Sequence, residues 1–190
     1  GSTDNSFDIV KKNIKNLEYQ ILQRETNGGQ TPSFESAFQI INSDYLIRMD
    51  SDLQDDPQDL YKFDEILDKN FDIILGFRGK RKHNIFLKIL TYFFDRIVNF
   101  LSFSNLRSSS GSFICFRSKF FKKIRLKNND HRYLTIIAQA KGAEKNISID
   151  INHRSRKFGK SNYNSFTKIL FGVFEIIGLY IRIKKKFYEK

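Results

Sequence analysis

Two carboxylates separated by one residue, Asp50 and Asp52, are the side chains whose type and spacing could do chemistry. They follow the apolar run 45–49, which predicts a short strand, so both are expected at a strand end. Two hard oxygen donors at this spacing can approach one divalent cation, and Mg²⁺ and Mn²⁺ prefer such ligands. Asp is also common in turns and helix caps, so an ordinary structural role is the alternative.

Basic residues outnumber acidic ones and gather in clusters. The 190-residue chain has 33 Lys and Arg against 21 Asp and Glu, a net charge of +12. Clusters lie at 79–83, 153–157 and 182–186, and each alone could be a solvated face. The charge suggests nucleic acid, an anionic membrane or a polyphosphate substrate as partner. The single cysteine, Cys115, excludes an internal disulfide, indicates a reducing compartment, and is expected to be a buried inert thiol.

Strand-forming and helix-forming segments alternate along the chain. Strands are expected at 17–22, 45–49, 71–75, 112–116 and 147–151. Helices are expected at 5–16, 31–41, 57–67, 85–101, 120–124, 132–141 and the C-terminus. This alternation predicts an α/β, Rossmann-like fold with a mainly parallel sheet flanked by helices. Such sheets bind ligands at the carboxyl ends of their strands, which points to the turn after Met49.

The C-terminal segment, 166–190, is expected to form an amphipathic and basic helix. Its apolar stretch, 169–181, is interrupted by Glu175 and is shorter than the roughly 20 apolar residues of a membrane span. The helix either lies at a membrane interface, with Lys184 to Lys186 meeting anionic headgroups, or packs on the domain's own core. The sequence leaves both possibilities open.

Several segments resemble, in order, the motifs of one known enzyme family. The segment at 49–57 reads Met49-Asp50-Ser51-Asp52-Leu53-Gln54-Asp55-Asp56-Pro57. It resembles the metal-binding signature of family 2 glycosyltransferases, in the branch with dolichol-phosphate mannose synthase and bacterial polyprenyl-phosphate sugar transferases. Segments 1–6, 27–30, 76–78, 110–117, 130–134 and 156–163 resemble further motifs of this branch. The resemblance covers residues 1 to about 170 and implies a GT-A fold, with residues 1–165 as the catalytic domain.

The resemblance also implies an activity and a set of site residues. The activity would be transfer of a sugar from a nucleotide-diphosphate donor to a polyprenyl phosphate, assisted by Mg²⁺ or Mn²⁺ bound to Asp50 and Asp52. The catalytic residues would be Asp52, Arg156 and Lys160. The substrate-binding residues would be Asp50, Gln54, Arg78, His131, Arg132, Ser161, Tyr163, Asn27 and Gln30. Arg156, Lys160 and Ser161 would close over the diphosphate, and Arg78, with His131 or Arg132, would meet an acceptor phosphate.

The sequence departs from the family pattern at three places. The family's opening strand, with its Pro-x-Tyr-Asn-Glu turn, is absent, so we expect an N-terminally truncated chain whose sheet lacks the first strand. Ser109 and Ser112 stand where many relatives carry Asp, which bears on a third metal ligand or general base. Asn162 replaces the Lys of the closing loop, where Lys160 would substitute.

The two serines suit a phosphate acceptor better than a hydroxyl acceptor. A phosphate, with a second pKa of about 6, is already largely ionised and needs no general base. The expected partners are therefore a nucleotide sugar, a polyprenyl phosphate and a membrane surface, but not nucleic acid. The expected location is cytoplasmic and peripheral at the inner face of the membrane. The alternatives are a family member with a saccharide hydroxyl acceptor in cell-surface polysaccharide synthesis, an inactive fragment, or a basic binding domain.

Overall fold

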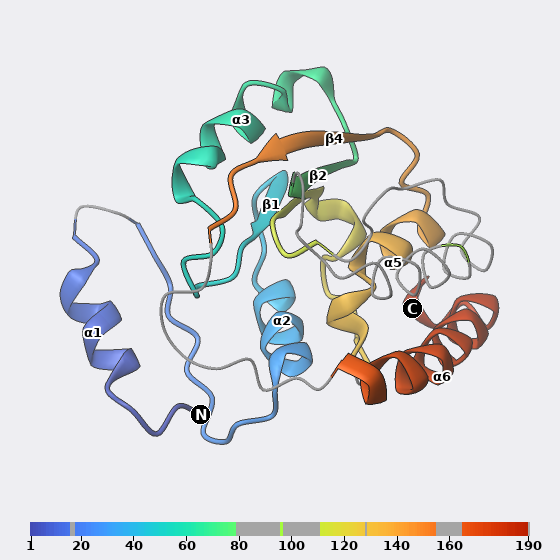
Figure 1. Cartoon of the computed structure of the whole chain (residues 1–190), viewed down its shortest axis with the longest axis horizontal. Coiled ribbons are helices and arrows are strands. Elements are labelled where there is room, and N and C mark those ends of the chain that lie inside the picture. Colours follow the sequence, from blue (N-terminus) through green and yellow to red (C-terminus); the bar gives the residue numbers. More distant parts are fainter. Residues whose placement is uncertain (16–17, 79–95, 97–110, 128, 155–164, 190) are drawn as a thin grey trace.

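The computed structural model describes residues 1–15, 18–78, 96, 111–127, 129–154 and 165–189 (Figure 1). The helix expected at 85–101 lies outside this described part, except for residue 96, which is helical. Six residues named in the sequence analysis lie outside it as well: Ser109, Arg156, Lys160, Ser161, Asn162 and Tyr163.

A four-stranded mixed sheet forms the centre of the described part. Its strands, in the order β1-β3-β2-β4, are β1 (Tyr45–Arg48), β3 (Ile114–Arg117), β2 (Ile73–Arg78) and β4 (Asn146–Ile151). β3 pairs antiparallel with both β1 and β2, whereas β2 and β4 pair in parallel. Three strands therefore point the same way and β3 runs against them. The expected α/β fold is confirmed, and β3 is the one strand that departs from a parallel arrangement.

Helices cover both faces of this sheet. They are α2 (Gln30–Gln39), α3 (Leu60–Asp64), α5 (Leu134–Ala140) and α6 (Ser165–Lys184), whereas α1 (Ser6–Asn13) buries no residue and lies apart from the sheet. Figure 1 shows α3 on one side of the sheet and α2, α5 and α6 on the other. Alternating residues of β2 belong to the two hydrophobic cores: Ile73 to the core that includes Phe38 of α2, and Ile74 to the core that includes Phe63 of α3. Such alternation is what a strand covered on both faces requires.

Three expected elements differ in the structure. The segment at 18–22 has no strand pairing, because an alternating pattern forms a strand only where a neighbour pairs its backbone groups. The helix expected at 57–67 is divided into a 3-10 turn η1 (Pro57–Asp59), α3, and a second 3-10 turn η2 (Leu67–Lys69). The helix expected at 120–124 is instead a 3-10 turn, η3 (Ser118–Phe120), followed by a turn.

Close packing at Gly76 lets β2 pass between its neighbours. A Cβ atom there would lie 2.7 Å from the Phe113 carbonyl oxygen and 2.8 Å from Ile151 Cδ1. Glycine at this position therefore allows β2 to lie this close to Phe113 and Ile151. Two residues later, β2 ends at Arg78. Nearby, Cys115 is fully buried, as expected, and burial raises the pKa of its thiol to about 12, which disfavours the reactive thiolate.

Helix α6 packs on the core through its inner face. Ile176 and Leu179 are buried there. The Glu175 carboxylate accepts hydrogen bonds from Asn129 (2.6 Å), Arg132 (3.2 Å) and Tyr133 (3.1 Å) around the 3-10 turn η4 (Asp130–Arg132). Of the two arrangements left open, packing on the domain is thus the observed one. In the described part of the chain, no helix is long and apolar enough to cross a membrane.

Candidate active site

Asp50 lies two residues beyond the end of β1, beside a buried cation. Arg48 Nη2 is 4.0 Å from Asp50 Oδ1. Arg48 Nη1 donates to the His131 carbonyl oxygen at 2.7 Å, and the guanidinium lies 4.9 Å from the centre of the Phe34 ring. Burial lowers the pKa of the Arg48 guanidinium, and the Asp50 carboxylate acts in the opposite direction. A fixed positive group therefore faces one of the two predicted metal ligands.

Asp52 is oriented by the turn that contains it. Its Oδ1 accepts a hydrogen bond from the Gln54 backbone N–H at 3.1 Å, and Leu53 between them has a φ of 60°. This is an Asx-type turn, in which a short carboxylate takes the place of a backbone carbonyl. Oxygen donors of this kind suit Mg²⁺ or Mn²⁺. Among the described residues, no group of three or more His, Cys, Asp or Glu could hold a metal ion, so a cation here would need further oxygen ligands.

The next carboxylate, Asp55, is the centre of a buried network. Its Oδ1 accepts from Arg78 Nε at 3.0 Å, and its Oδ2 accepts from Arg78 Nη2 at 2.8 Å. Ser112 Oγ also donates to Oδ2 at 2.8 Å, and His153 Nδ1 lies 3.4 Å from Oδ1. Asp55 is only 1% exposed, so this charge is held by partners rather than by water. Sequence reasoning did not single out Asp55 as a site residue, because its neighbours suggested only a helix start.

Residues that follow β4 are tied to the same turn. Arg154 N–H donates to the Gln54 carbonyl oxygen at 2.8 Å, and the Arg154 guanidinium pairs with Asp56. Asp56 also caps η1 by accepting from the Gln58 N–H at 3.2 Å, as its position before Pro57 suggested. The beginning of the basic segment 153–157 therefore lies at residues 50–56, the acidic turn. Arg154 is a further residue that sequence reasoning missed, although it stands next to the motif at 156–163.

His131 is held as a neutral side chain between two elements. Its Nδ1 lies 2.7 Å from Thr31 Oγ1 of α2, and its ring stacks on Phe34. Burial, with Arg48 and Arg132 adding to it, lowers the pKa of His131 to about 4. The neighbouring Arg132 pairs with Glu175 of α6. Among the described residues, no side-chain contact joins His131 or Arg132 to the acidic turn. The link is indirect, because Arg48 donates to the His131 carbonyl oxygen and also lies beside Asp50.

The remaining predicted residues are distributed unevenly. Gln54 belongs to the acidic turn and contributes backbone N–H and carbonyl groups to it. Asn27, just before α2, and Gln30, its first residue, are exposed, and Asn27 Oδ1 accepts from the Gly29 N–H at 3.1 Å. No contact found among the described residues joins either of them to the acidic turn. The structure thus brings together Asp50, Asp52, Gln54 and Arg78, and leaves Asn27 and Gln30 apart from them.

Comparison with known proteins identifies the family. Residues 1–126 match the family described as Glycosyl transferase family 2, and the chain therefore belongs to that family, whose catalytic fold is GT-A. Members of the family generally use a divalent metal cation. The predicted family and fold are confirmed.

Named relatives extend the similarity beyond the family domain. The undecaprenyl-phosphate 4-deoxy-4-formamido-L-arabinose transferase of Photorhabdus laumondii is 25% identical over 183 residues, which are 93% of this chain and 54% of that protein. The dodecaprenyl-phosphate galacturonate synthase of Rhizobium johnstonii is 25% identical over 168 residues, 86% of this chain and 50% of that protein. The chain spans about half the length of the curated relatives it matches.

Proposed function

We propose that this chain carries the catalytic region of a glycosyltransferase that moves a sugar from a nucleotide diphosphate to a polyprenyl phosphate. Residues 1–165 would form the catalytic domain and residues 166–190 its C-terminal helix. The observation that carries the proposal is the acidic turn at the end of β1, surrounded by Arg48, Arg78 and Arg154. Family membership and the names of the two relatives support the same chemistry.

At the donor side, Asp50 and Asp52 would hold Mg²⁺ or Mn²⁺. The cation would offset the negative charge that grows on the departing diphosphate. The hydrogen bond from the Gln54 N–H fixes the Asp52 carboxylate, so that it needs little reorganisation to bind. Gln54, Asn27 and Gln30 would contribute polar contacts to the donor.

The basic segment after β4 would approach the diphosphate from the side of Arg154. Because two residues span at most about 7 Å, Arg156 can reach the surroundings of the acidic turn from the anchored Arg154. Lys160, Ser161 and Tyr163 follow Arg156 in the sequence. Cations from Arg156 and Lys160 would stabilise the leaving group without a proton transfer.

At the acceptor side, Arg78 and Arg132 would meet the phosphate, and His131 would contact substrate only as a neutral imidazole because of its lowered pKa. Asp55 and Ser112 engage Nε and Nη2 of Arg78, so we propose Nη1 as the group that meets the acceptor. Ser112 is buried and bonded to Asp55, and Asp55 is itself ion-paired, which supports an acceptor that needs no general base.

We further propose that the protein acts in the cytoplasm, peripherally at the inner face of a membrane. Phe174, Ile177 and Ile181 lie one or two turns apart on α6 and remain exposed, by 69%, 47% and 47%. Lys184, Lys185 and Lys186 follow at the end of the helix and are exposed as well. An apolar stripe that ends in cations fits the interface of an anionic bilayer.

The test is transfer of label from a panel of nucleotide sugars by the chain with Mn²⁺. One arm contains polyprenyl phosphate and a second contains soluble saccharides. We expect transfer to the lipid phosphate only, and loss of at least a hundredfold in Asp52→Asn. The exposed Asp64→Asn is the matched control and should retain activity. Transfer to saccharides but not to the lipid phosphate would overturn the proposed acceptor.

A further inference from the structure

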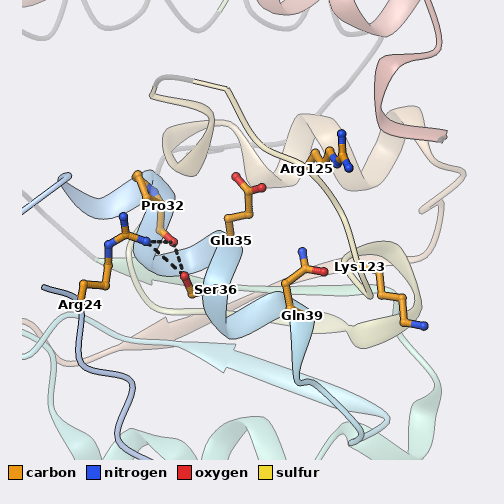
Figure 2. A pocket seen from close by; sticks show the side chains of 7 residues that line it. All are labelled: Arg24, Pro32, Glu35, Ser36, Gln39, Lys123 and Arg125. Carbon is orange, nitrogen blue, oxygen red and sulfur yellow. Dashed lines mark hydrogen bonds between the residues drawn. The ribbon is translucent and has the colours of Figure 1, made fainter. Parts of the chain in front are cut away.

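A basic pocket lies along the outer face of α2, away from the acidic turn. It has a volume of about 500 Å³ and is lined by Arg24, Pro32, Glu35, Ser36, Gln39, Lys123 and Arg125. Figure 2 shows Arg24 on one side of α2, and Lys123 and Arg125 on the other. The C-terminal end of α2 leads towards the start of β1, whereas the acidic turn follows the end of β1. None of the residues that line the pocket belongs to the acidic turn.

Hydrogen bonds between the walls hold this pocket in shape. Gln39 Nε2 donates to the Ile124 carbonyl oxygen at 3.0 Å, and the Leu126 N–H donates to Glu35 Oε2 at 3.3 Å. These two bonds flank Arg125 and fasten its segment to α2. The Lys123 N–H adds a third, to the Phe38 carbonyl oxygen at 3.2 Å. The pocket is thus built by the fold rather than by the chance orientation of surface side chains.

The pocket carries more positive charge than its own residues offset. Three cations, Arg24, Lys123 and Arg125, face one carboxylate, Glu35. Within the part of the chain that the structure describes, none of the three cations forms an ion pair with an acidic side chain. Arg24 uses Nη1 to reach Pro32 and Ser36, while its Nε is buried and lacks a hydrogen-bond partner in the described part. The net positive charge of the lining therefore favours an anionic ligand.

The backbone conformation of Lys123 is a second indication that the pocket is a binding site. Lys123 has a φ of 58°, which is unusual for a residue with a side chain. Such conformations persist where the surrounding structure holds them, often at binding sites. Here the conformation places a lysine on the wall of the pocket.

We propose that this pocket binds the phosphate group of a small hydroxylated phosphate monoester. Lys123 and Arg125, which lie on the same side of α2, would donate charge-assisted hydrogen bonds to the phosphate oxygens, and Arg24 would add positive charge from the other side. Gln39 and Glu35 would accept hydrogen bonds from hydroxyl groups, and the volume suits a ligand of this size. The ligand is either a free metabolite or the headgroup of a lipid, since both present the same phosphate. This site lies outside the proposed transfer reaction and does not depend on it.

The experiment measures binding of two probes that share a phosphomonoester. Glycerol 3-phosphate is titrated calorimetrically, and vesicles containing phosphatidic acid are tested by co-sedimentation, both with EDTA to remove any metal from the acidic turn. Arg125→Ala and Lys123→Asn test the pocket, and asparagine tolerates the left-handed backbone at position 123. Lys122→Ala is the matched control, because Lys122 is exposed on the same segment and does not line the pocket.

We expect saturable binding of glycerol 3-phosphate that weakens at least tenfold in Arg125→Ala and Lys123→Asn, and stays within twofold in Lys122→Ala. If only the vesicles bind, with the same dependence on Arg125, the phosphate belongs to a lipid headgroup. The proposal is overturned if neither probe binds saturably, or if Lys122→Ala weakens binding as much as Arg125→Ala. Thermal unfolding of each variant excludes misfolding as the cause.

Discussion

Asp55 and Arg78 form a two-pronged ion pair, with Nε–Oδ1 and Nη2–Oδ2 distances of 3.0 and 2.8 Å. The pair joins the acidic turn to the end of β2, 23 residues further along the chain. Ser112, which precedes β3, and His153, which follows β4, also contact Asp55. One carboxylate therefore connects the parts of the chain that surround the candidate active site.

Replacing Asp55 by Asn should destabilise the protein by about 3 kcal/mol, because Arg78 would keep a mostly buried charge without its counterion. The side chains are 0% and 15% exposed, so water can compensate only in part. Urea unfolding measures the change. The double variant Asp55→Leu with Arg78→Met should lose less than Asp55→Asn. A single variant as stable as the wild type would show that the pair contributes nothing.

His131 should make stability depend on pH between about 4 and 6.5. Its pKa is about 4 in the folded protein and about 6.5 in an unfolded chain. Between these values the unfolded chain binds a proton that the folded protein excludes, so stability is complete above pH 6.5 and falls as the pH decreases towards 4. The difference reaches about 3 kcal/mol at the acidic end.

The measurement compares urea unfolding of the wild type and His131→Gln at several pH values. Carboxylates titrate in both proteins, so their contribution cancels in the difference. We expect the stability difference between the two proteins to shrink or reverse as the pH is lowered. Parallel pH profiles would contradict a protonation penalty at His131.

Local patterns in the sequence were enough to locate the acidic turn but not its partners. The apolar run before Asp50 predicts a strand end, and the strand is present at Tyr45–Arg48. Asp55, in contrast, is defined by Arg78 and Ser112, which lie 23 and 57 residues away. No local spacing reports such pairings, because they arise only when the sheet assembles.

Strand direction and strand pairing were also beyond local reasoning. An apolar run such as Ile114–Arg117 predicts a strand but does not say which way it runs beside β1 and β2. Alternation at 18–22 is compatible with a strand, but the structure gives this segment no pairing partner. The outer face of α6 was likewise ambiguous, since Ile176 and Ile177 are equally apolar and only packing buries the former.

The exposed stripe on α6 should bind anionic vesicles. Changing Phe174 and Ile177 to Ser removes two large apolar groups, each contributing up to about 2 kcal/mol when it enters an apolar environment. We expect vesicle binding to weaken at least tenfold, and added salt to weaken the remaining binding through Lys184 to Lys186. Ile9→Ser is the control, since Ile9 is 58% exposed on α1. Equal vesicle binding by the wild type and all variants would contradict the proposal that α6 binds the membrane.

The most direct test of the acidic turn as a metal–diphosphate site is Mn²⁺ binding, followed by electron paramagnetic resonance, with a panel of nucleoside diphosphates. We predict that a nucleotide strengthens Mn²⁺ binding to the wild type and to Asp64→Asn. Asp52→Asn, which keeps the size of the side chain and removes its charge, should weaken that binding at least tenfold. Undiminished nucleotide-dependent Mn²⁺ binding by Asp52→Asn would contradict the assignment.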